Sequence, residues 1–319
     1  MRKRAAVFMM LTAATIGVSA CGTNDTAKAA PQQLNIGTAS MGGAFYPFGQ
    51  GIANLVTQYA DGLTMTPEVT GGAVENCRLV SSKEVDFALT NENHAYAATM
   101  GEEPFEEKEN LCVVARLYPS VLHIIVPEDS DINSIEDLKG KRIAVGPAGG
   151  GTIAPLEAVF EEYGMTAEDM VPSYLSYSDG FTQLADGNVD AALALSGYPA
   201  SAVMEYSSTK TVKFVNIDDD KFEAIMEKRP YYNKVEIPAD VYKMKEPGLA
   251  LGINNVLITR PDMDEEVVYK VTSSLFEHLE EFQETNATAK MVSIENAVGS
   301  SVEMHPGARR YFDEKLNGK

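Results

Sequence analysis

The stretch GPAGGGT at residues 146–152 decides how the surrounding chain is organised. The apolar run KRIAV at 141–145 precedes it and predicts a buried strand, and the amphipathic run IAPLEAVFEEYG at 153–164 predicts a helix. Glycines at a strand-to-helix turn let the backbone approach a ligand closely, and the N-terminus of the following helix favours an anion. A tight turn without a ligand also needs glycine, so this loop alone leaves both interpretations open.

Motifs for nucleotide binding and catalysis do not fit the sequence. Gly146 and Gly151 have the spacing of a P-loop, but Thr152 stands where that motif requires lysine, and the GxGxxG pattern is not met. The four histidines have no metal-ligand spacing, and no GxSxG motif occurs. We therefore expect no catalytic residue, no metal site and no cofactor.

A weak internal repeat divides the chain into two similar halves. In the first half, the strand-like run LNIGTAS at 34–40 meets a glycine turn, and helix-like and alternating runs lead on to VDFAL at 85–89. In the second half, KRIAV, GPAGGGT and the same succession of runs lead to VDAAL at 189–193. Alternating strands and helices predict a mostly parallel sheet, covered by helices, in each half.

The remaining segments predict two crossings between two lobes. LHIIVPE at 122–128 leads out of the first lobe, and GLALGINNVLITR at 248–260 leads back. A helix over 261–282, with Asp262 as its N-cap, and a last helix over 306–317 return to the first lobe. Two crossings make a hinge, with a ligand cleft at the strand ends. The predicted domains are 34–120 with 250–319 for lobe I, and 121–249 for lobe II.

The N-terminus has the pattern of a bacterial lipoprotein. Basic residues 2–4 precede an apolar run that ends at Ala20, which predicts a signal peptide over residues 1–20. The sequence VSAC at 18–21 resembles a lipobox, which predicts lipid attachment at Cys21 and a lipid-anchored linker over residues 21–33. An ordinary signal peptide followed by a chance cysteine is the alternative. In both cases we expect an extracytoplasmic protein, in the periplasm or at the cell surface.

Charge and cysteine usage restrict the partners of the chain. The formal net charge is −20, so nucleic acid, which needs a basic protein face, is not an expected partner. Cys77 lies on an apolar stripe with Val74 and Val80 and is predicted to be buried. A disulfide between Cys77 and Cys112 stays open, because the expected compartment is oxidising.

Four motifs resemble those of the TAXI family of solute receptors, which serve TRAP transporters. They are IGTASMGGAFYPFG at 36–49, TGGAVENCRLV at 70–80, SIEDLKGKRIAVGPAGGGT at 134–152 and MHPGARRYF at 304–312. The resemblance implies an α/β periplasmic-binding-protein fold of the type II kind, with two lobes, a hinge and an interlobe ligand cleft. It implies no enzymatic activity.

The resemblance also implies capture of a small organic anion or amino acid, such as glutamate or 2-oxoglutarate, and its delivery to a TRAP membrane permease. Carried onto this sequence, the ligand contacts come from the glycine loop of each lobe and from strand ends. They are Ser40, Met41, Gly42, Gly43, Ala44, Phe45, Tyr46, Asn91, Gly149, Gly150, Gly151, Thr152, Ser196, Gly197 and Tyr198. We expect backbone amides and hydroxyls to hold the anion, with an arginine clamp at Arg78 or Arg116 as the competing mechanism.

Two other functions compete with transport. A sensory lipoprotein of the same fold would pass its ligand signal to a receptor kinase instead of a permease, and nothing in the sequence excludes it. An enzyme built on the two-lobed fold is disfavoured, because the sequence offers no cluster of histidine, cysteine or metal-ligating residues.

Overall fold

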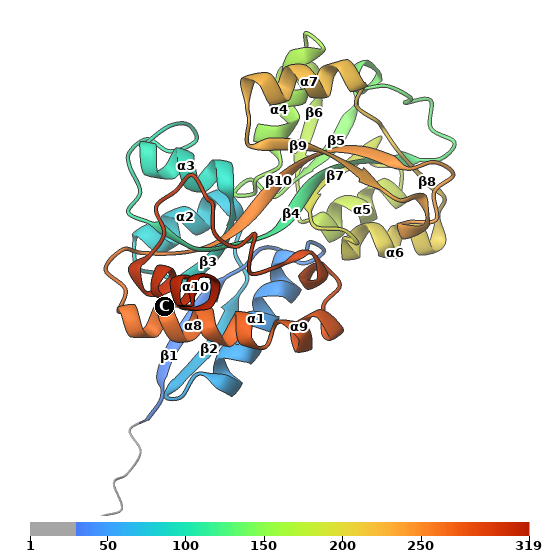
Figure 1. Ribbon diagram of the computed structural model, residues 1–319. Helices are drawn as coiled ribbons and strands as arrows, with labels where there is room; N and C mark the ends of the chain where they lie inside the picture. The colour runs from blue at the N-terminus through green and yellow to red at the C-terminus, as the bar shows by residue number, and fades with distance from the viewer. Residues whose placement is uncertain (1–29, 319) are drawn as a thin grey trace, which may run out of the picture. The chain divides into compact units, whose positions relative to one another are not determined.

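The computed structural model of the chain describes residues 30–318 (Figure 1). The predicted signal peptide and the predicted lipid-attachment residue, Cys21, lie outside these residues. The first strand begins at Gln32, so the last residues assigned to the linker already belong to the folded part. Within residues 30–318, no helix has both the length and the apolar character that a membrane span requires.

Two successive units of three strands and three helices confirm the internal repeat. The first unit comprises β1 (Gln32–Gly37), α1 (Phe45–Tyr59), β2 (Leu63–Glu68), α2 (Ala73–Ser81), β3 (Phe87–Asn91) and α3 (Glu92–Met100). The second comprises β5 (Arg142–Gly146), α4 (Ile153–Glu162), β6 (Val171–Tyr174), α5 (Tyr177–Ala185), β7 (Ala191–Ser196) and α6 (Ser201–Thr209). β1 pairs in parallel with β2 and β3, and β5 pairs in parallel with β6 and β7. The two glycine loops therefore occupy equivalent places, after the central strand of each unit.

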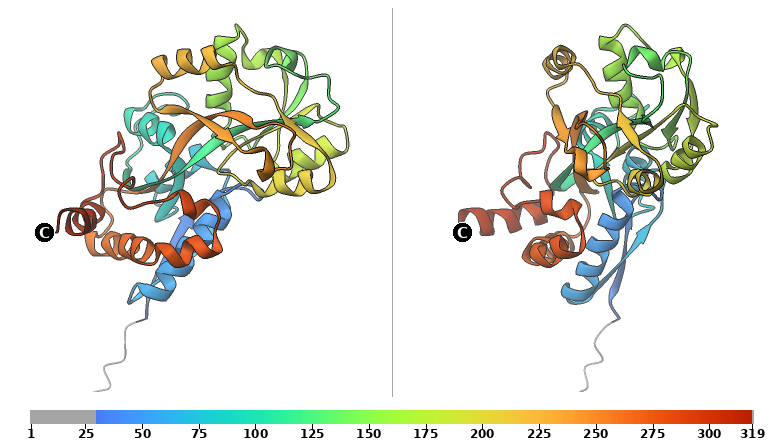
Figure 2. Two further views of the ribbon diagram at one scale, coloured as in Figure 1. Left: turned by 45° about the vertical axis from the view of Figure 1, so that its right-hand side comes forward. Right: turned by 90° about the vertical axis from the view of Figure 1, so that its right-hand side faces the viewer.

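Two long antiparallel strands, β4 (Cys112–Pro127) and β10 (Gly248–Thr259), run between the lobes (Figure 2). β10 pairs with β3 and β4 pairs with β7, which gives the strand order β2-β1-β3-β10-β4-β7-β5-β6. β4 begins well before the predicted start at residue 122. Arg116 and Pro119 interrupt its apolar pattern, and a register shift next to Pro119 accommodates the proline in the sheet.

The remaining elements complete the two lobes. The second lobe adds β8 (Val212–Phe214), α7 (Asp219–Lys228) and β9 (Tyr232–Ile237), and the two added strands pair with β4 and β10. The chain then returns to the first lobe with α8 (Glu265–Glu277), α9 (Leu279–Thr285) and α10 (Pro306–Asn317). Both α1 and α10 pack against α8, which confirms the predicted return of the C-terminal helices.

Helices cover both faces of the sheet in each lobe (Figure 1). In the first lobe, α1, α8 and α10 share one hydrophobic cluster and α2 and α3 share another. In the second lobe, α4 and α7 share one cluster, and α5 and α6 share the other. The spacing of Phe48, Ile52 and Val56 explains how α1 packs, because all three lie on one helix face and are fully buried. The exact lobe boundaries, at 120/121 and 249/250, stay a prediction.

The N-cap of α8 differs from the predicted one. Asp264 caps this helix, since its Oδ1 accepts hydrogen bonds from the backbone N–H groups of Glu266 and Val267, both at 3.0 Å. The predicted helix over 261–282 is thus shorter at its start, and it divides into α8 and α9.

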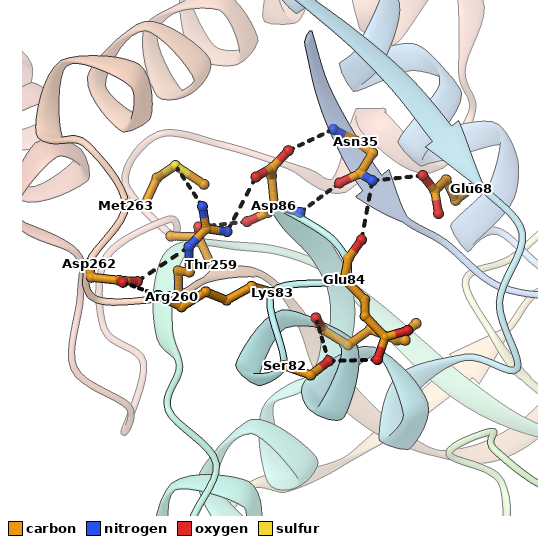
Figure 3. A network of polar contacts seen from close by, with 11 residues as sticks. Asn35, Glu68, Ser82, Lys83, Glu84, Asp86, Thr259, Arg260, Asp262 and Met263 are labelled. Atoms are coloured by element: carbon orange, nitrogen blue, oxygen red, sulfur yellow. Dashed lines mark hydrogen bonds and ion pairs between the residues drawn. The ribbon is translucent and has the colours of Figure 1, made fainter. Parts of the chain in front are cut away.

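The carboxylate of Asp262 has other partners, which is why the predicted cap is wrong. It pairs with Arg260 at 3.3 Å and with Lys83 at 2.5 Å (Figure 3). The same network continues to a reciprocal pair in which Asn35 N donates to Asp86 Oδ2 at 3.1 Å and Asp86 N donates to Asn35 Oδ1 at 2.7 Å. These contacts fasten β1 and the start of β3 to the end of β10.

Both cysteines in the described part of the chain are free and buried, so a disulfide between them is excluded. Cys77 is fully buried, as its apolar stripe predicts. Burial raises the pKa of Cys77 and of Cys112 to about 12, so both remain protonated at neutral pH. Neither side chain is therefore a reactive thiolate.

Candidate ligand-binding site

Equivalent loops of the two lobes meet around one small cavity, which we call the interlobe cavity. The first lobe contributes the β1–α1 loop, the β2–α2 loop and the end of β3, and the second contributes the β5–α4 loop, the start of α5 and the end of β7. The lining residues are Ala39, Gly43, Ala44, Phe45, Gly71, Gly72, Ala73, Asn91, Pro147, Gly150, Gly151, Tyr177 and Leu195. The structural repeat therefore places the same kind of loop on both sides of the cleft.

The interlobe cavity has a volume of only about 20 Å³. A water molecule needs roughly 10–15 Å³ on the same measure, so the cavity holds about one water. Pockets for small organic molecules have volumes of about 300–1,000 Å³. The two lobes are thus closed on each other in this structure, and a larger ligand requires them to separate.

Hydrogen bonds between the lobes join helix N-termini to oxygen atoms. Ala44 N, at the start of α1, donates to Ser196 Oγ at 2.8 Å. At the start of α2, Val74 N and Glu75 N donate to the carbonyl oxygen of Gly149 at 3.2 and 3.3 Å. In each contact, a lobe supplies an oxygen atom to a helix N-terminus of the other lobe.

Several of these helix N-termini lack a side-chain cap. No side chain of Ala44, Gly72 or Thr152, which precede α1, α2 and α4, makes a capping hydrogen bond. The first N–H groups of a helix have no partner within the helix and carry partial positive charge. No lysine or arginine is among the residues that line the interlobe cavity. The arrangement can therefore attract an anion through backbone groups alone.

The predicted contact residues fall into three groups. Gly43, Ala44, Phe45, Asn91, Gly150 and Gly151 line the interlobe cavity. Gly42, Gly149 and Ser196 make hydrogen bonds between the lobes, with Gly42 O accepting from Ala202 N at 3.0 Å. Thr152, Ser40 and Gly197 are next to the cavity-lining segments, whereas Met41, Tyr46 and Tyr198 are not among its lining residues.

The neighbours of the second group of glycines explain why glycine is needed. A Cβ atom on Gly151 would lie 2.3 Å from Asn91 Oδ1, in the opposite lobe. A Cβ on Gly197 would lie 2.8 Å from the ring of Tyr118. Met41, by contrast, is 58% exposed on the surface of its loop. The close approach of the two lobes thus depends on the missing side chain at residue 151.

The two arginines of the competing clamp do not reach this cavity. Arg78 is exposed and donates to the carbonyl oxygen of Pro104 at 2.7 Å. Arg116 forms an ion pair with Glu92 at 3.0 Å. Both guanidinium groups therefore have partners elsewhere in the first lobe.

The sequence analysis missed several residues around the cavity. Gly71, Gly72 and Ala73 repeat the pattern of glycine before a helix, so a signal was present in TGGAV. Tyr177 had no such signal, because its place depends on tertiary packing. Its hydroxyl lies 3.0 Å from Thr152 Oγ1 and accepts a hydrogen bond from Leu195 N at 3.2 Å.

A layer of buried polar side chains lies between the cavity and the strands that cross between the lobes. Asn91 Nδ2 and Ser120 Oγ both donate to Asn255 Oδ1, at 2.7 and 2.9 Å. Asn255 Nδ2 and His94 Nε2 are buried and have no hydrogen-bond partner among the described residues. Burial lowers the pKa of His94 to about 4, although the backbone of Gly151 acts in the opposite direction. His94 is therefore neutral in the closed arrangement.

The two lobes, the crossing strands and the loops at the strand ends define a type II periplasmic-binding-protein fold. The chain belongs to the NMT1-like family, whose sequence model matches residues 36–315.

Solved structures of low sequence identity have the same fold. A protein from Bordetella bronchiseptica RB50 is 14% identical, with a TM-score of 0.54, over 89% of this chain and 98% of that one. A putative L-cystine ABC transporter from Listeria monocytogenes is 16% identical, with a TM-score of 0.50, over 82% and 98%. The alkanesulfonate-binding protein SsuA from Xanthomonas axonopodis pv. citri, bound to MOPS, is 17% identical, with a TM-score of 0.49, over 89% and 84%.

Proposed function

We propose that the protein is an extracytoplasmic solute receptor that binds a small organic anion or amino acid between its lobes. In keeping with the TAXI resemblance, it delivers this ligand to a TRAP membrane permease. One observation carries the proposal: uncapped helix N-termini from both lobes converge on a cavity that basic side chains do not line. A glutamate-like or 2-oxoglutarate-like ligand has the negative charge that such a site favours.

The proposed binding cycle starts with the lobes apart. Separation frees Ala44 N from Ser196 and the N-terminus of α2 from Gly149. A ligand carboxylate then accepts hydrogen bonds from these N–H groups, and the lobes close around it. A hydrogen bond to a charged group contributes about 1.5–3 kcal/mol, against about 1 kcal/mol for a neutral pair. The anion therefore replaces the neutral oxygen atoms with a net gain.

Binding rather than catalysis is proposed because the site lacks an activated group. The two described cysteines are buried thiols with a pKa of about 12. His94, near the cavity, is neutral, and no hydrogen bond links it to a hydroxyl or thiol. The side chains around the interlobe cavity can thus orient a ligand without attacking it.

The site of anchoring belongs to the same proposal. Cys21 would carry the lipid, and the residues that follow it would tether the lobes to the membrane. Mass spectrometry of the purified protein would find an acylated N-terminal Cys21, and Cys21→Ala would release the protein from membranes. An unmodified N-terminus at a different residue would contradict the lipoprotein assignment.

Calorimetric titration with organic acids and amino acids tests the proposal. A true ligand at about 100 times its dissociation constant adds roughly 2.7 kcal/mol to the free energy of unfolding, so a thermal-shift screen selects the compounds to titrate. One binding site per chain and a ligand that is recovered unchanged are the expected results. Turnover of the bound compound, or binding only of cations, would refute it.

A further inference from the structure

A second groove between the lobes lies on the other side of the first turn of α3. It has a volume of about 770 Å³, within the range of small-molecule sites. Glu92, Tyr96 and Arg116 line it from the first lobe, Tyr231 and Asn233 from the second, and Asn254 from β10. It shares no lining residue with the interlobe cavity. We call it the tyrosine groove.

A buried ion pair forms one wall of the tyrosine groove. Arg116 Nη2 lies 3.0 Å from Glu92 Oε1, and Ser301 N donates to the same oxygen atom at 3.0 Å. Arg116 Nη2 also donates to the carbonyl oxygen of Gly299. The Glu92 side chain is only 6% exposed, so its charge depends on these partners.

The contacts of this ion pair are one-sided. Every hydrogen bond from the described residues to Glu92 falls on Oε1, and none falls on Oε2. On the arginine, Nη2 makes the two side-chain hydrogen bonds, and Nε is buried without a partner. A carboxylate oxygen and guanidinium nitrogens, side by side, thus retain hydrogen-bonding capacity.

Two tyrosines from opposite lobes complete the groove. Tyr96 is 39% exposed and Tyr231 is 41% exposed, although both rings are large and apolar. Tyr231 is held in place by Tyr232, whose ring centroid lies 4.8 Å away. Exposed aromatic rings in a groove offer apolar contact area together with a polar hydroxyl. The amide side chains of Asn233 and Asn254 add further hydrogen-bonding groups.

We propose that the tyrosine groove is a second ligand site, for a zwitterionic α-amino acid with an aromatic or branched apolar side chain. The ammonium group binds Glu92, the carboxylate binds Arg116, and the side chain lies against Tyr96 and Tyr231. An α-amino acid matches the ion pair because one carbon atom joins its two charged groups, so they too lie side by side. A ligand with one charge would leave the other member of the pair without a partner.

Calorimetric titration of the mature protein with L-phenylalanine tests this site. The controls are 3-phenylpropanoate, which lacks the ammonium group, and phenethylamine, which lacks the carboxylate. We expect L-phenylalanine to bind and each control compound to bind at least tenfold more weakly. Equal affinity for either control compound would overturn the zwitterion assignment. Absence of binding for both L-phenylalanine and L-leucine at millimolar concentration would overturn the site.

Matched variants locate the binding. Glu92→Gln keeps an acceptor oxygen for Arg116 and Ser301 and removes the charge, and Tyr231→Ala removes the aromatic wall of the second lobe. Each should weaken L-phenylalanine at least fivefold, whereas Tyr174→Ala, at an exposed tyrosine outside the groove, should not. Binding that survives both groove variants would overturn the proposal.

Titration of the same variants with glutamate and 2-oxoglutarate keeps the two proposals apart. If L-phenylalanine binding is lost in Gly150→Asp but not in Glu92→Gln, the amino acid binds in the interlobe cavity and the groove proposal fails alone. If the groove variants lose L-phenylalanine while no anion binds to any variant, the proposed function fails and the groove stands.

Discussion

The backbone N–H of Ala44 donates a hydrogen bond to Ser196 Oγ at 2.8 Å, so a side chain of one lobe closes a helix N-terminus of the other. Ala44 precedes α1, and Ser196 is the last residue of β7. Together with the carbonyl of Gly149 at the start of α2, this contact holds the lobes closed. The donors that close the empty protein are the ones proposed to bind the anion, so ligand and closed empty state compete for them.

Ser196→Ala should weaken the closed state. The variant removes the oxygen atom that Ala44 N contacts, and a hydrogen bond of this kind contributes about 1 kcal/mol. Small-angle X-ray scattering of the unliganded variant should show a larger radius of gyration, and urea denaturation a slightly lower free energy of unfolding.

Ser207→Ala is the matched control for this experiment. Ser207 lies in α6 and donates to Met204 O at 3.1 Å, a contact within one lobe. Its loss should leave the scattering curve unchanged. A Ser196→Ala protein as compact as the wild type would show that this contact does not hold the lobes together.

Ligand affinity should fall as the pH falls from about 6.5 towards 4. In the closed arrangement, burial lowers the pKa of His94 to about 4, whereas lobe opening uncovers it and restores an ordinary value near 6.5. Between these values the open state binds more protons, so acid favours opening and base favours closure. Titrations of the selected anion at pH 7.5, 6.5 and 5.5 measure the effect.

The two buried histidines allow a controlled comparison. His123 also has a pKa lowered to about 4 by burial, but it lies inside the second lobe, where Nε2 is 2.9 Å from Tyr242 OH. His94→Gln should therefore flatten the pH dependence of ligand affinity, and His123→Gln should leave it in place while changing the pH dependence of unfolding. The same slope in wild type and His94→Gln would contradict the assignment.

Neither arginine of the clamp mechanism should matter for anion binding in the interlobe cavity. Arg78 contacts Pro104 O, and Arg116 is paired with Glu92, so neither guanidinium faces this cavity. Arg78→Met should keep the anion affinity within about threefold of the wild type, less than 1 kcal/mol. Calorimetry checks this value, and abolished binding in a folded Arg78→Met protein would favour a clamp over backbone amides.

The repeat in the sequence was enough to predict the fold, because strand and helix periodicities are local. β5 and α4 follow KRIAV and the amphipathic run after GPAGGGT, as expected. Elements without such periodicity were missed. α7 begins in the acidic run at 218–220, and only Phe222 and Ile225 of this helix are buried.

The candidate site was predictable only in part, for a physical reason. Glycine before a helix is a local signal, so Gly150 and Gly151 could be identified from the sequence. The contacts of Asn255 and Tyr177 depend on how β10 and α5 pack against distant segments. Which loops meet across the cleft is likewise a property of lobe closure, and no local pattern encodes it.

Gly150→Asp should weaken anion binding at least tenfold while preserving the fold. Gly150 lines the interlobe cavity at the N-terminal side of α4, so a carboxylate there would repel the anion and compete for the same amides. A charge at a helix end contributes about 0.3–2 kcal/mol, and tenfold corresponds to about 1.4 kcal/mol. Calorimetric titration of the anion selected in the screen measures the loss.

Gly150→Asn separates charge from shape in this experiment. A Cβ atom at residue 150 would lie 2.9 Å from the carbonyl oxygen of Pro147, so both variants must shift the loop by the same small amount. Asp should therefore bind the anion much more weakly than Asn, with unchanged circular dichroism in both. Equal losses would assign the effect to the loop shift, and full affinity in both would remove this loop from the ligand site.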